Sequence, residues 1–504
     1  MAATSIDDLP EALLLHILSF LPTLNAVRAS FVSRRWRDLW RHLPRLDFDM
    51  SLYHSPPNAL CEFREFFADF ITQTLLLCEH STLLYSFRLL FNYRDYRRTT
   101  TQVNSWIRYA IATGVIVVLL SFPEDLFVKS EVDTDEDETW QKYDFHFSNI
   151  RNSWVSCLEL NYCRIVWPKS LPCDGFSSLR SLYLCDVSLR ATVLYNLVSS
   201  CVSLEFLSLS RISYLRNFKI HSQTLKELEL ELFKFRRYKD AGSLEIYAPN
   251  LHRISFDRFS VAEYCSRDLS SLVEANVEFW REDRHEDFNC DVLQLLTGVE
   301  RLTLLDMRFD RHIWNYVMEE VKIDVATVGA PNPSEVHVNL RSDQTEFYYM
   351  QTFILCSLWV ALTSRDFTKS DLFVSSKVSA TKNTSVSLVF KNLKFLELKI
   401  GYTEYELLEI AAFLEVCPVL ETLVLNYYVE TDWPLSEYLK SKNPTFNIPN
   451  LKQVKMLNYR GTEMELYVVE LLELHNVVLE KIVAFPQVAN GKSSAPLVLL
   501  DSLQ

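Results

Sequence analysis

Histidine and cysteine are the side chains best suited to metal binding and nucleophilic chemistry, and this 504-residue sequence holds eleven of each. No cysteine lies within three residues of another, so the C-x-x-C spacing of zinc and redox sites does not occur. The histidines form no H-E-x-x-H pair, and no close group of His, Cys and carboxylate residues suggests a metal site. A triad assembled from distant residues stays open, because triads are defined by geometry and not by chain order. We expect no catalytic residue, no metal and no cofactor.

Glycine is scarce, with only eight residues in the whole chain. No two of them are close enough to form G-x-G-x-x-G, G-x-x-x-x-G-K-[ST] or G-x-S-x-G. Those loops need glycine because their backbone takes positive φ or approaches a phosphate closely. The common nucleotide-binding and hydrolase classes therefore lose their main support.

The charge balance argues against nucleic acid as a partner. The chain carries 65 acidic and 51 basic side chains, for a formal net charge of −14. Phosphate contacts need a local surplus of Lys and Arg. The arginine-rich stretch at residues 34–41 does not supply one, because residues 1–50 hold six Arg and also six acidic residues.

The sequence also predicts where the protein resides. The N-terminus lacks a basic segment followed by an apolar one. Two apolar runs, at 114–122 and 353–362, reach only half of the roughly 20 residues that a spanning helix needs. Scattered cysteines suit reduced thiols. We expect a protein of the nucleus or cytoplasm with no membrane segment.

Three short helices are predicted between residues 9 and 40. In the first, Leu13, Leu14, Ile17, Leu18 and Leu21 follow one another at helical spacing. Its start carries possible caps at residues 7 and 8 and a proline at residue 10, Pro22 ends it, and residue 23 can cap the second helix. Below about 40 residues such a unit cannot bury its own apolar surface. It must pack on the following domain, on a partner chain, or on both.

The run DLPEALLLHILSFLP at 8–22, continuing as VRASFVSRRWRDLW at 27–40 and LPRLDF at 43–48, closely resembles the F-box. In particular it resembles the F-box of the plant F-box/LRR/FBD family. The resemblance implies a trihelical module that docks on a Skp-type adaptor, which in turn binds a cullin scaffold with a RING subunit. By position it assigns the adaptor contacts to Leu9, Pro10, Leu13, Ile17, Leu18, Leu21, Val27, Val32, Trp36 and Trp40. The family often has Arg-Ile-Ser where this chain has Ile-Asp-Asp at 6–8, which we expect to change the helix cap and not the docking.

A motif of the form L-x-x-L-x-L recurs beyond residue 48. Copies begin at residues 155, 179, 204, 225, 251, 272 and 299, so they are 24, 25, 21, 26, 21 and 27 residues apart. This is the spacing of leucine-rich repeats, in which each copy buries its apolar side against its neighbours. The pattern resumes at residues 393, 420 and 451, and a copy at residue 115 is a candidate for the first strand. The predicted fold is α/β: a short trihelical F-box, a leucine-rich-repeat solenoid and a C-terminal cap.

Side chains between the apolar positions of each copy point outward, because the period of a strand is two. They are the candidate substrate-binding surface, with Tyr183, Phe206, Glu227, Glu229, Glu231 and Arg253 as the chosen residues. The glutamate row has two interpretations: an acidic strip for a basic substrate segment, or solvent-facing positions that are simply polar. The second needs no ligand and is preferred here.

Two stretches interrupt the repeats. Residues 131–138 (EVDTDEDE) resemble a calcium loop only superficially, because the turn position holds Glu138 instead of glycine, and a solvated loop is expected. Between about 308 and 387 the repeat phase is lost, through an insertion, degenerate repeats or sequence foreign to the family. Residues 433–485 resemble the FBD module of the same plant family, through LKQVK at 451–455, RGTEMEL at 460–466, ELLELHN at 470–476 and VLEKIV at 478–483. A strand, a glycine turn and an amphipathic helix are expected there, as a final repeat that caps the array.

The predicted domains are an F-box at 1–50, divergent repeats at 51–310, an insertion or degenerate repeats at 311–390, repeats at 391–430 and an FBD-like segment at 431–490. The predicted function is substrate recognition in a Skp–cullin–F-box ubiquitin ligase, without catalysis by this chain. Two alternatives remain: a small-molecule, hormone-like receptor of the F-box/LRR type, and a repeat scaffold outside any ligase.

Overall fold

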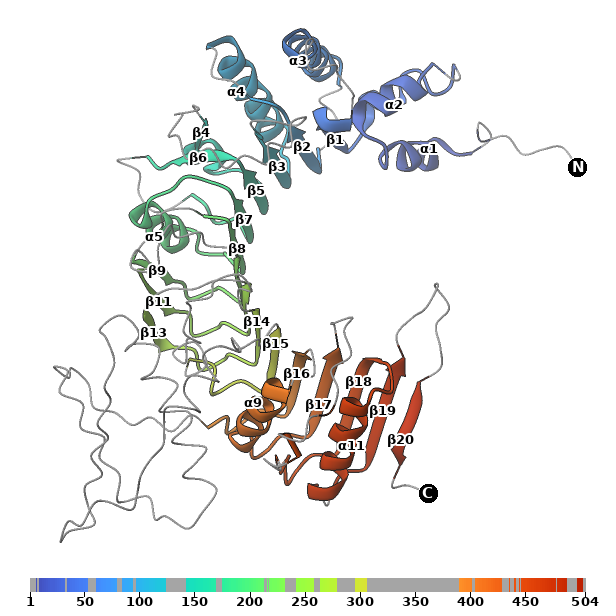
Figure 1. Ribbon diagram of the computed structural model, residues 1–504. Helices are drawn as coiled ribbons and strands as arrows, with labels where there is room; N and C mark the ends of the chain where they lie inside the picture. The colour runs from blue at the N-terminus through green and yellow to red at the C-terminus, as the bar shows by residue number, and fades with distance from the viewer. Residues whose placement is uncertain are drawn as a thin grey trace, which may run out of the picture. The chain divides into compact units, whose positions relative to one another are not determined.

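The computed structural model describes residues 6, 9–31, 34–52, 60–78, 84–93, 97–123, 142–168, 175–212, 215, 217–231, 242–257, 263–278, 295–305, 389–400, 404–427, 435, 439–440, 444, 446–476, 478–486 and 496–501. The chain forms two compact units, Met1–Leu272 and Val273–Gln504. Each unit is built on its own set of parallel strands (Figure 1).

The first unit begins with helices α1 (Glu11–Leu18) and α2 (Thr23–Ala29) and the 3₁₀ helix η2 (Leu39–His42). The third predicted helix is therefore a single 3₁₀ turn of four residues. Pro10 and Pro22 are the N-cap residues, and neither helix has a side-chain cap. The expectation that Thr23 caps α2 is wrong, because its hydroxyl accepts a hydrogen bond from the Asp47 backbone N–H instead. Residues 7, 8 and 32 lie outside the described residues.

Eight parallel strands follow in this unit, each paired with the next. They are β1 (Arg45–Asp49), β2 (Ser86–Leu90), β3 (Val117–Ser121), β5 (Cys157–Asn161), β7 (Ser181–Cys185), β8 (Phe206–Ser210), β10 (Glu227–Glu231) and β12 (Arg253–Asp257). Their register aligns equivalent leucines, so that Leu158, Leu182, Leu207 and Leu228 form one fully buried row. A row of this kind is the shared core that a single repeat could not form alone.

Helices and short strands of the first unit connect these main strands and pack on one side of them (Figure 1). The helices are α3 (Leu60–Leu77), α4 (Arg97–Ala112) and α5 (Ala191–Ser200), with 3₁₀ turns η3 (Met50–Leu52) and η5 (Phe147–Ile150). The short strands are β4 (Tyr143–His146) with β6 (Cys163–Val166), and β9 (Phe218–His221), β11 (Ser243–Tyr247) and β13 (Glu263–Asp268). In Figure 1 the β9–β11–β13 sheet lies next to α5, to the left of the main strands.

The second unit repeats the scheme, and its strands from β16 to β19 are one or two residues longer. It contains β14 (Glu274–Glu278), β15 (Arg301–Leu305), β16 (Phe395–Ile400), β17 (Thr422–Tyr427), β18 (Gln453–Tyr459) and β19 (Lys481–Pro486), with helices α9 (Glu404–Glu415) and α11 (Glu463–His475). The final strand β20 (Leu497–Asp501) pairs antiparallel with β19 and covers its edge. β15 pairs directly with β16, although 89 residues separate Leu305 from Phe395 in the sequence. The sheet thus passes from one to the other without an intervening strand.

The predicted repeats are confirmed as strands. All eleven L-x-x-L-x-L copies contain a strand that begins two residues after the copy does. The copy at residue 115 is not the first strand, because β1 and β2 precede it in the sheet. The strand, glycine turn and helix predicted for the FBD-like segment are β18, Gly461 at φ +76° and α11. Residues 131–138 and nearly all of 311–390 lie outside the described part of the chain.

Candidate functional site

Helix α1 carries two apolar stripes on different faces. Leu14 and Leu18, one turn apart, are completely buried. Leu13 and Ile17, also one turn apart, are 48% and 36% exposed. A short helix that is apolar on two sides must bury each against a different neighbour. The first stripe faces the chain's own interior, and the second faces outward.

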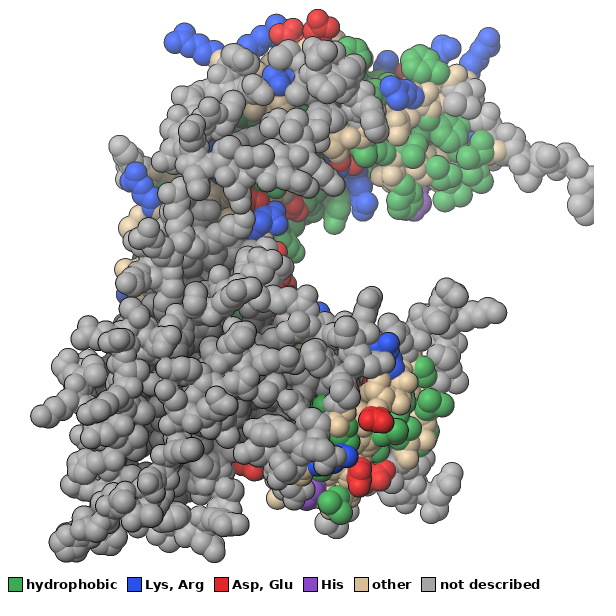
Figure 2. Space-filling view, in the orientation of Figure 1, with side chains coloured by type: hydrophobic (Ala, Val, Ile, Leu, Met, Phe, Trp, Pro, Cys, Tyr) green, Lys and Arg blue, Asp and Glu red, His purple; other side chains and the backbone are tan. Residues whose placement is uncertain are grey.

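Aromatic residues extend the outward stripe. Phe20 is 68% exposed, Leu21 is 38% exposed and Phe31 at the end of α2 is 85% exposed. Figure 2 shows hydrophobic side chains gathered over α1 and α2. We call Leu13, Ile17, Phe20, Leu21 and Phe31 the exposed apolar surface. Exposed large apolar groups gathered in one small segment are typical of interaction sites.

Phe20 and Phe31 were not among the predicted contacts. Phe20 could have been found, because it stands three residues after Ile17 and so continues the same helical face. Phe31 gave no periodic signal, since it lies beyond the C-cap residue Ser30 of α2.

The other predicted adaptor contacts divide by burial. Leu18, Trp36 and Trp40 are 0%, 7% and 7% exposed, so they fill the interior of the N-terminal segment. Leu9 and Val27 are half-buried and Pro10 is exposed, while Val32 lies outside the described residues. An adaptor role for these residues stays a prediction, and the three buried side chains have little surface to offer a partner.

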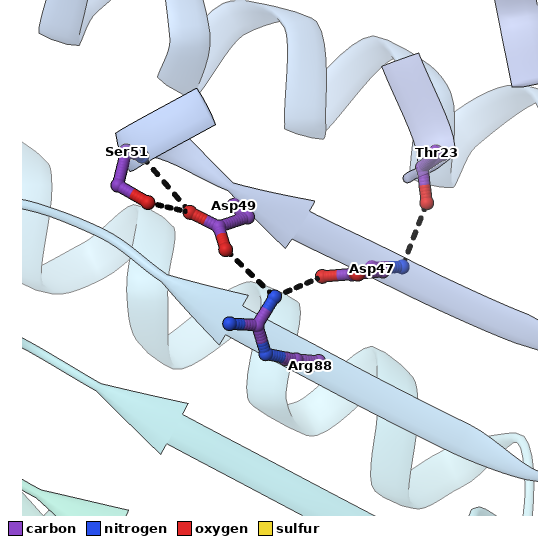
Figure 3. Close-up of polar contacts among 5 residues, drawn as sticks. All are labelled: Thr23, Asp47, Asp49, Ser51 and Arg88. Carbon is purple, nitrogen blue, oxygen red and sulfur yellow. Dashed lines mark hydrogen bonds and ion pairs between the residues drawn. The ribbon is translucent and has the colours of Figure 1, made fainter. Parts of the chain in front are cut away.

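The N-terminal helices are joined to the repeat sheet by a polar junction (Figure 3). The Asp47 backbone N–H in β1 donates to the hydroxyl of Thr23, at 2.7 Å, and Thr23 is completely buried. Arg88 in β2 donates to Asp47 and to Asp49, both at 2.8 Å. The Asp49 carboxylate also accepts from the backbone and hydroxyl of Ser51. α2, β1 and β2 are thereby tied together through side chains as well as through the sheet.

The charges at this junction favour the ion pairs of Arg88 with Asp47 and Asp49. Burial acts against the charge of Arg88, but hydrogen bonds and charge from Asp47, and then from Asp49, outweigh it and raise the pKa of Arg88. Asp49 is 6% exposed, so its carboxylate depends on these partners for compensation of lost hydration. The junction therefore holds the N-terminal helices in a fixed orientation on the first strands.

The predicted substrate-binding residues lie on one face of β7, β8, β10 and β12. The rings of Tyr183 and Phe206 are neighbours, with centroids 4.7 Å apart. Arg253 lies 3.9 Å from the carboxylate of Glu227, and Ser210 donates to Glu231 at 2.7 Å. Each residue is partly exposed, as the strand period requires, but no substrate contact is tested by this geometry.

Two features of the described residues bear on metal and thiol chemistry. No group of three or more His, Cys, Asp or Glu among them is arranged to hold a metal ion. Burial raises the pKa of Cys163 and of Cys201 to about 12. Both thiols are thus protonated near neutral pH. No described helix has the length and apolarity to cross a membrane.

Comparison with known families agrees with the geometry. An F-box domain matches residues 6–48, and the leucine-rich-repeat domain described as At1g61320/AtMIF1 matches residues 76–322 and 319–488. These matches cover most of the chain. It belongs to the plant F-box/LRR/FBD-type proteins. Members of this family are in general non-catalytic adaptors.

Individual relatives of this F-box/LRR chain come from Arabidopsis thaliana. The F-box/FBD/LRR-repeat protein At2g04230 is 32% identical over 303 residues, 59% of this chain and 62% of that protein. The F-box/LRR-repeat protein At3g26922 is 30% identical over 321 residues, 60% of this chain and 92% of that protein. A third relative, At3g59240, whose name carries the terms F-box, FBD and LRR repeat, is 27% identical over 470 residues, 87% of this chain and 85% of that protein.

Proposed function

We propose that this F-box/LRR chain is the substrate receptor of a Skp–cullin–F-box ubiquitin ligase. The exposed apolar surface of α1 and α2 carries the proposal, because it lies within the F-box match and its own chain leaves it uncovered among the described residues. A Skp-type adaptor is the partner that an F-box implies. A cullin scaffold and its RING subunit would then join through the adaptor.

In this function the chain supplies position and not chemistry. Ubiquitin transfer depends on holding a substrate near a charged enzyme, where effective concentration and orientation raise the rate. The junction of Thr23, Asp47 and Arg88 supports such a role, because it fixes the F-box helices to the first repeat strands. We further propose that the protein works in the nucleus or cytoplasm.

The test is co-purification of the full chain with a Skp-type adaptor. The informative variant is Leu13→Asp/Ile17→Asp, which places two charges in the exposed stripe of α1 and leaves the buried stripe intact. We expect adaptor binding to fall at least about 100-fold, because burying two unpaired carboxylates in an interface costs several kcal/mol.

A control is Leu474→Asp, which charges a more exposed leucine of α11, 73% exposed, in the other unit. It should bind the adaptor like the wild type. Failure of the folded wild-type chain to bind any Skp-type adaptor would remove the proposal and favour a repeat scaffold outside a ligase.

A further inference from the structure

The outward face of five neighbouring strands in the first unit forms an ordered surface. Parallel register sets its side chains in rows, with about 4.8 Å between strands. One row is Glu159, Tyr183, Ser208, Glu229 and Ser255; the next is Cys157, Ser181, Phe206, Glu227 and Arg253. α5 and the β9–β11–β13 sheet lie on the opposite side of these strands (Figure 1). We call these rows, with Asn161, Cys185, Ser210, Glu231 and Asp257, the outward face.

Two aromatic rings form the apolar centre of the outward face. Tyr183 and Phe206 pack at 4.7 Å between centroids, with an interplanar angle of 34°. Both remain partly exposed. Strand register places Glu159 beside Tyr183 and Glu227 beside Phe206. Burial, and then the charges of Cys157, Glu229, Glu159 and Glu227, raise the pKa of Tyr183. Aromatic faces with carboxylates beside them are favourable for a Lys or Arg side chain.

The charge on this face is strongly one-sided. Its acidic residues are Glu159, Glu227, Glu229, Glu231 and Asp257, and Arg253 is its one basic residue. Five negative charges and one positive charge leave a net charge of −4. The corresponding face of the second unit has three acidic residues (Glu274, Glu278, Glu397) and four basic residues (Arg301, Lys399, Lys455, Lys481), a net charge of +1. The negative excess is thus specific to one face, and it is complementary to a basic partner.

The chain itself shows how basic side chains bind to such faces. Arg253 extends to within 3.9 Å of the Glu227 carboxylate across neighbouring strands. In the second unit the guanidinium of Arg301 lies 4.0 Å from the ring centroid of Phe395, again across neighbouring strands. Ion pairing and stacking on an aromatic ring are therefore both compatible with side chains held on these sheets.

We propose that the outward face docks an extended, Lys- or Arg-containing segment of the protein substrate, with one basic side chain over Tyr183 and Phe206 and others at Glu227, Glu229 and Glu231. This inference rests on the proposed receptor function and names the class of substrate. A segment of roughly six extended residues, at about 3.3 Å each, spans the five strands. The occupant is a protein segment and not nucleic acid, because the face repels phosphate.

The probe is a set of fluorescein-labelled peptides of about ten residues, in which Lys, Glu or Ser alternates with Thr. Binding to the full chain purified with its adaptor is followed by fluorescence anisotropy. The Lys peptide should bind, and the Glu and Ser peptides should bind at least about tenfold more weakly. Glu227→Gln/Glu229→Gln/Glu231→Gln keeps side-chain shape and should weaken the Lys peptide about tenfold, since each exposed pair contributes only a fraction of a kcal/mol.

Two further variants separate docking from damage to the fold. Glu397→Gln removes a carboxylate from the outward side of the second unit and should leave peptide binding unchanged. Arg253→Gln removes the only cation of the outward face and should tighten the Lys peptide about two- to threefold, an increase that misfolding cannot produce.

Several outcomes would overturn the inference. These are equal binding of the Lys and Ser peptides, unchanged Lys-peptide binding by the triple Gln variant, or weaker binding by Arg253→Gln. Adaptor binding is measured on the same preparations, so a chain that holds its adaptor but ignores basic peptides loses this inference and keeps the proposed function. A chain that fails to hold an adaptor loses the proposed function. Its preference among the Lys, Glu and Ser peptides then tests separately whether the outward face binds basic segments.

Discussion

Thr23 stands at a helix start, where a threonine hydroxyl usually accepts a bond from its own helix. Here the proline before it is the N-cap, and the hydroxyl instead accepts from the Asp47 backbone N–H at 2.7 Å. β1 is the edge strand of its sheet, so this N–H would otherwise have no strand partner on that side. The buried Thr23 hydroxyl thus supplies the hydrogen-bond acceptor that a neighbouring strand would otherwise provide.

Thr23→Val should therefore destabilise the first unit without changing its packing volume. It leaves a buried N–H without an acceptor, at a cost of about 2 kcal/mol. Urea unfolding measures the change. Thr101→Val is the matched control, because the Thr101 hydroxyl bonds the Arg97 carbonyl on an exposed helix surface, and it should change stability by less than about 0.5 kcal/mol. Equal effects of the two substitutions would contradict this account of the junction.

Two buried thiols make the free energy of unfolding depend on pH. Burial raises the pKa of Cys163 and of Cys201 from 9.0 to about 12. The unfolded chain ionises these groups first, so the stability they contribute is complete below pH 9 and is lost as the pH rises toward 12. Cys201→Ala should make the fall in unfolding free energy between pH 9 and 10.5, measured in reductant, shallower by up to about 1.4 kcal/mol per pH unit. A slope equal to that of the wild type would show that Cys201 ionises alike in both states.

At the scale of elements, the helix ends differ between the two units. α1 and α2 have no side-chain cap, whereas α11 begins with a complete capping box. Thr462 accepts from the Glu465 N–H, and the Glu465 carboxylate accepts from the N–H of Thr462 at 2.9 Å and of Arg460 at 3.2 Å. Glu465 is 1% exposed, so it serves as a buried acceptor for the turn before α11 as well as for the helix.

Glu465→Ala should for this reason cost more than an ordinary cap. Two part-buried N–H groups lose their acceptor, and we expect a loss of about 2 kcal/mol, compared with about 1 kcal/mol for Thr462→Ala. Glu470→Ala, at an exposed position of the same helix, is the control and should be close to neutral. Thermal unfolding of the three variants ranks their losses of stability. A Glu465→Ala loss no larger than that of Thr462→Ala would mean that water replaces the carboxylate.

Sequence predicted the elements whose pattern repeats at regular spacing, and missed those that occur outside it, including the long helices α3 and α4. The eleven copies located their strands because two leucines and the spacing between copies agree. β4, β6, β9, β11 and β13 have only four to six residues, and alternation over so few positions also occurs by chance. The helical spacing of Leu13, Leu14, Ile17, Leu18 and Leu21 predicts a single apolar face. Only tertiary packing separates buried Leu14 and Leu18 from exposed Leu13 and Ile17.

At the scale of the whole molecule, charges alternate along the residues that precede the strands. In the first unit Arg180, Glu205 and Lys226 occupy this position in successive repeats, and Glu205 pairs with both neighbours. In the second unit the series is Glu300, Lys394, Glu421, Lys452 and Glu480, with ion pairs of 3.4 Å and 2.8 Å. Lys394 and Glu300 meet although they lie 94 residues apart in sequence. Alternation opposes misalignment of repeats, because a shift by one copy brings like charges together.

This interpretation predicts that sign order matters more than any individual charge. Glu205→Lys places three cations in succession and should lower the melting temperature of the first unit by about 2–4 °C. Arg180→Glu/Glu205→Lys/Lys226→Glu inverts the whole series, restores alternation and should return the melting temperature to near the wild-type value. Both differences should shrink in 1 M salt, where the screening length is about 3 Å. If the inverted triple variant melts as low as Glu205→Lys, the particular side-chain geometry of Glu205 is what stabilises the repeats. If it recovers, alternation itself is the property that aligns neighbouring repeats.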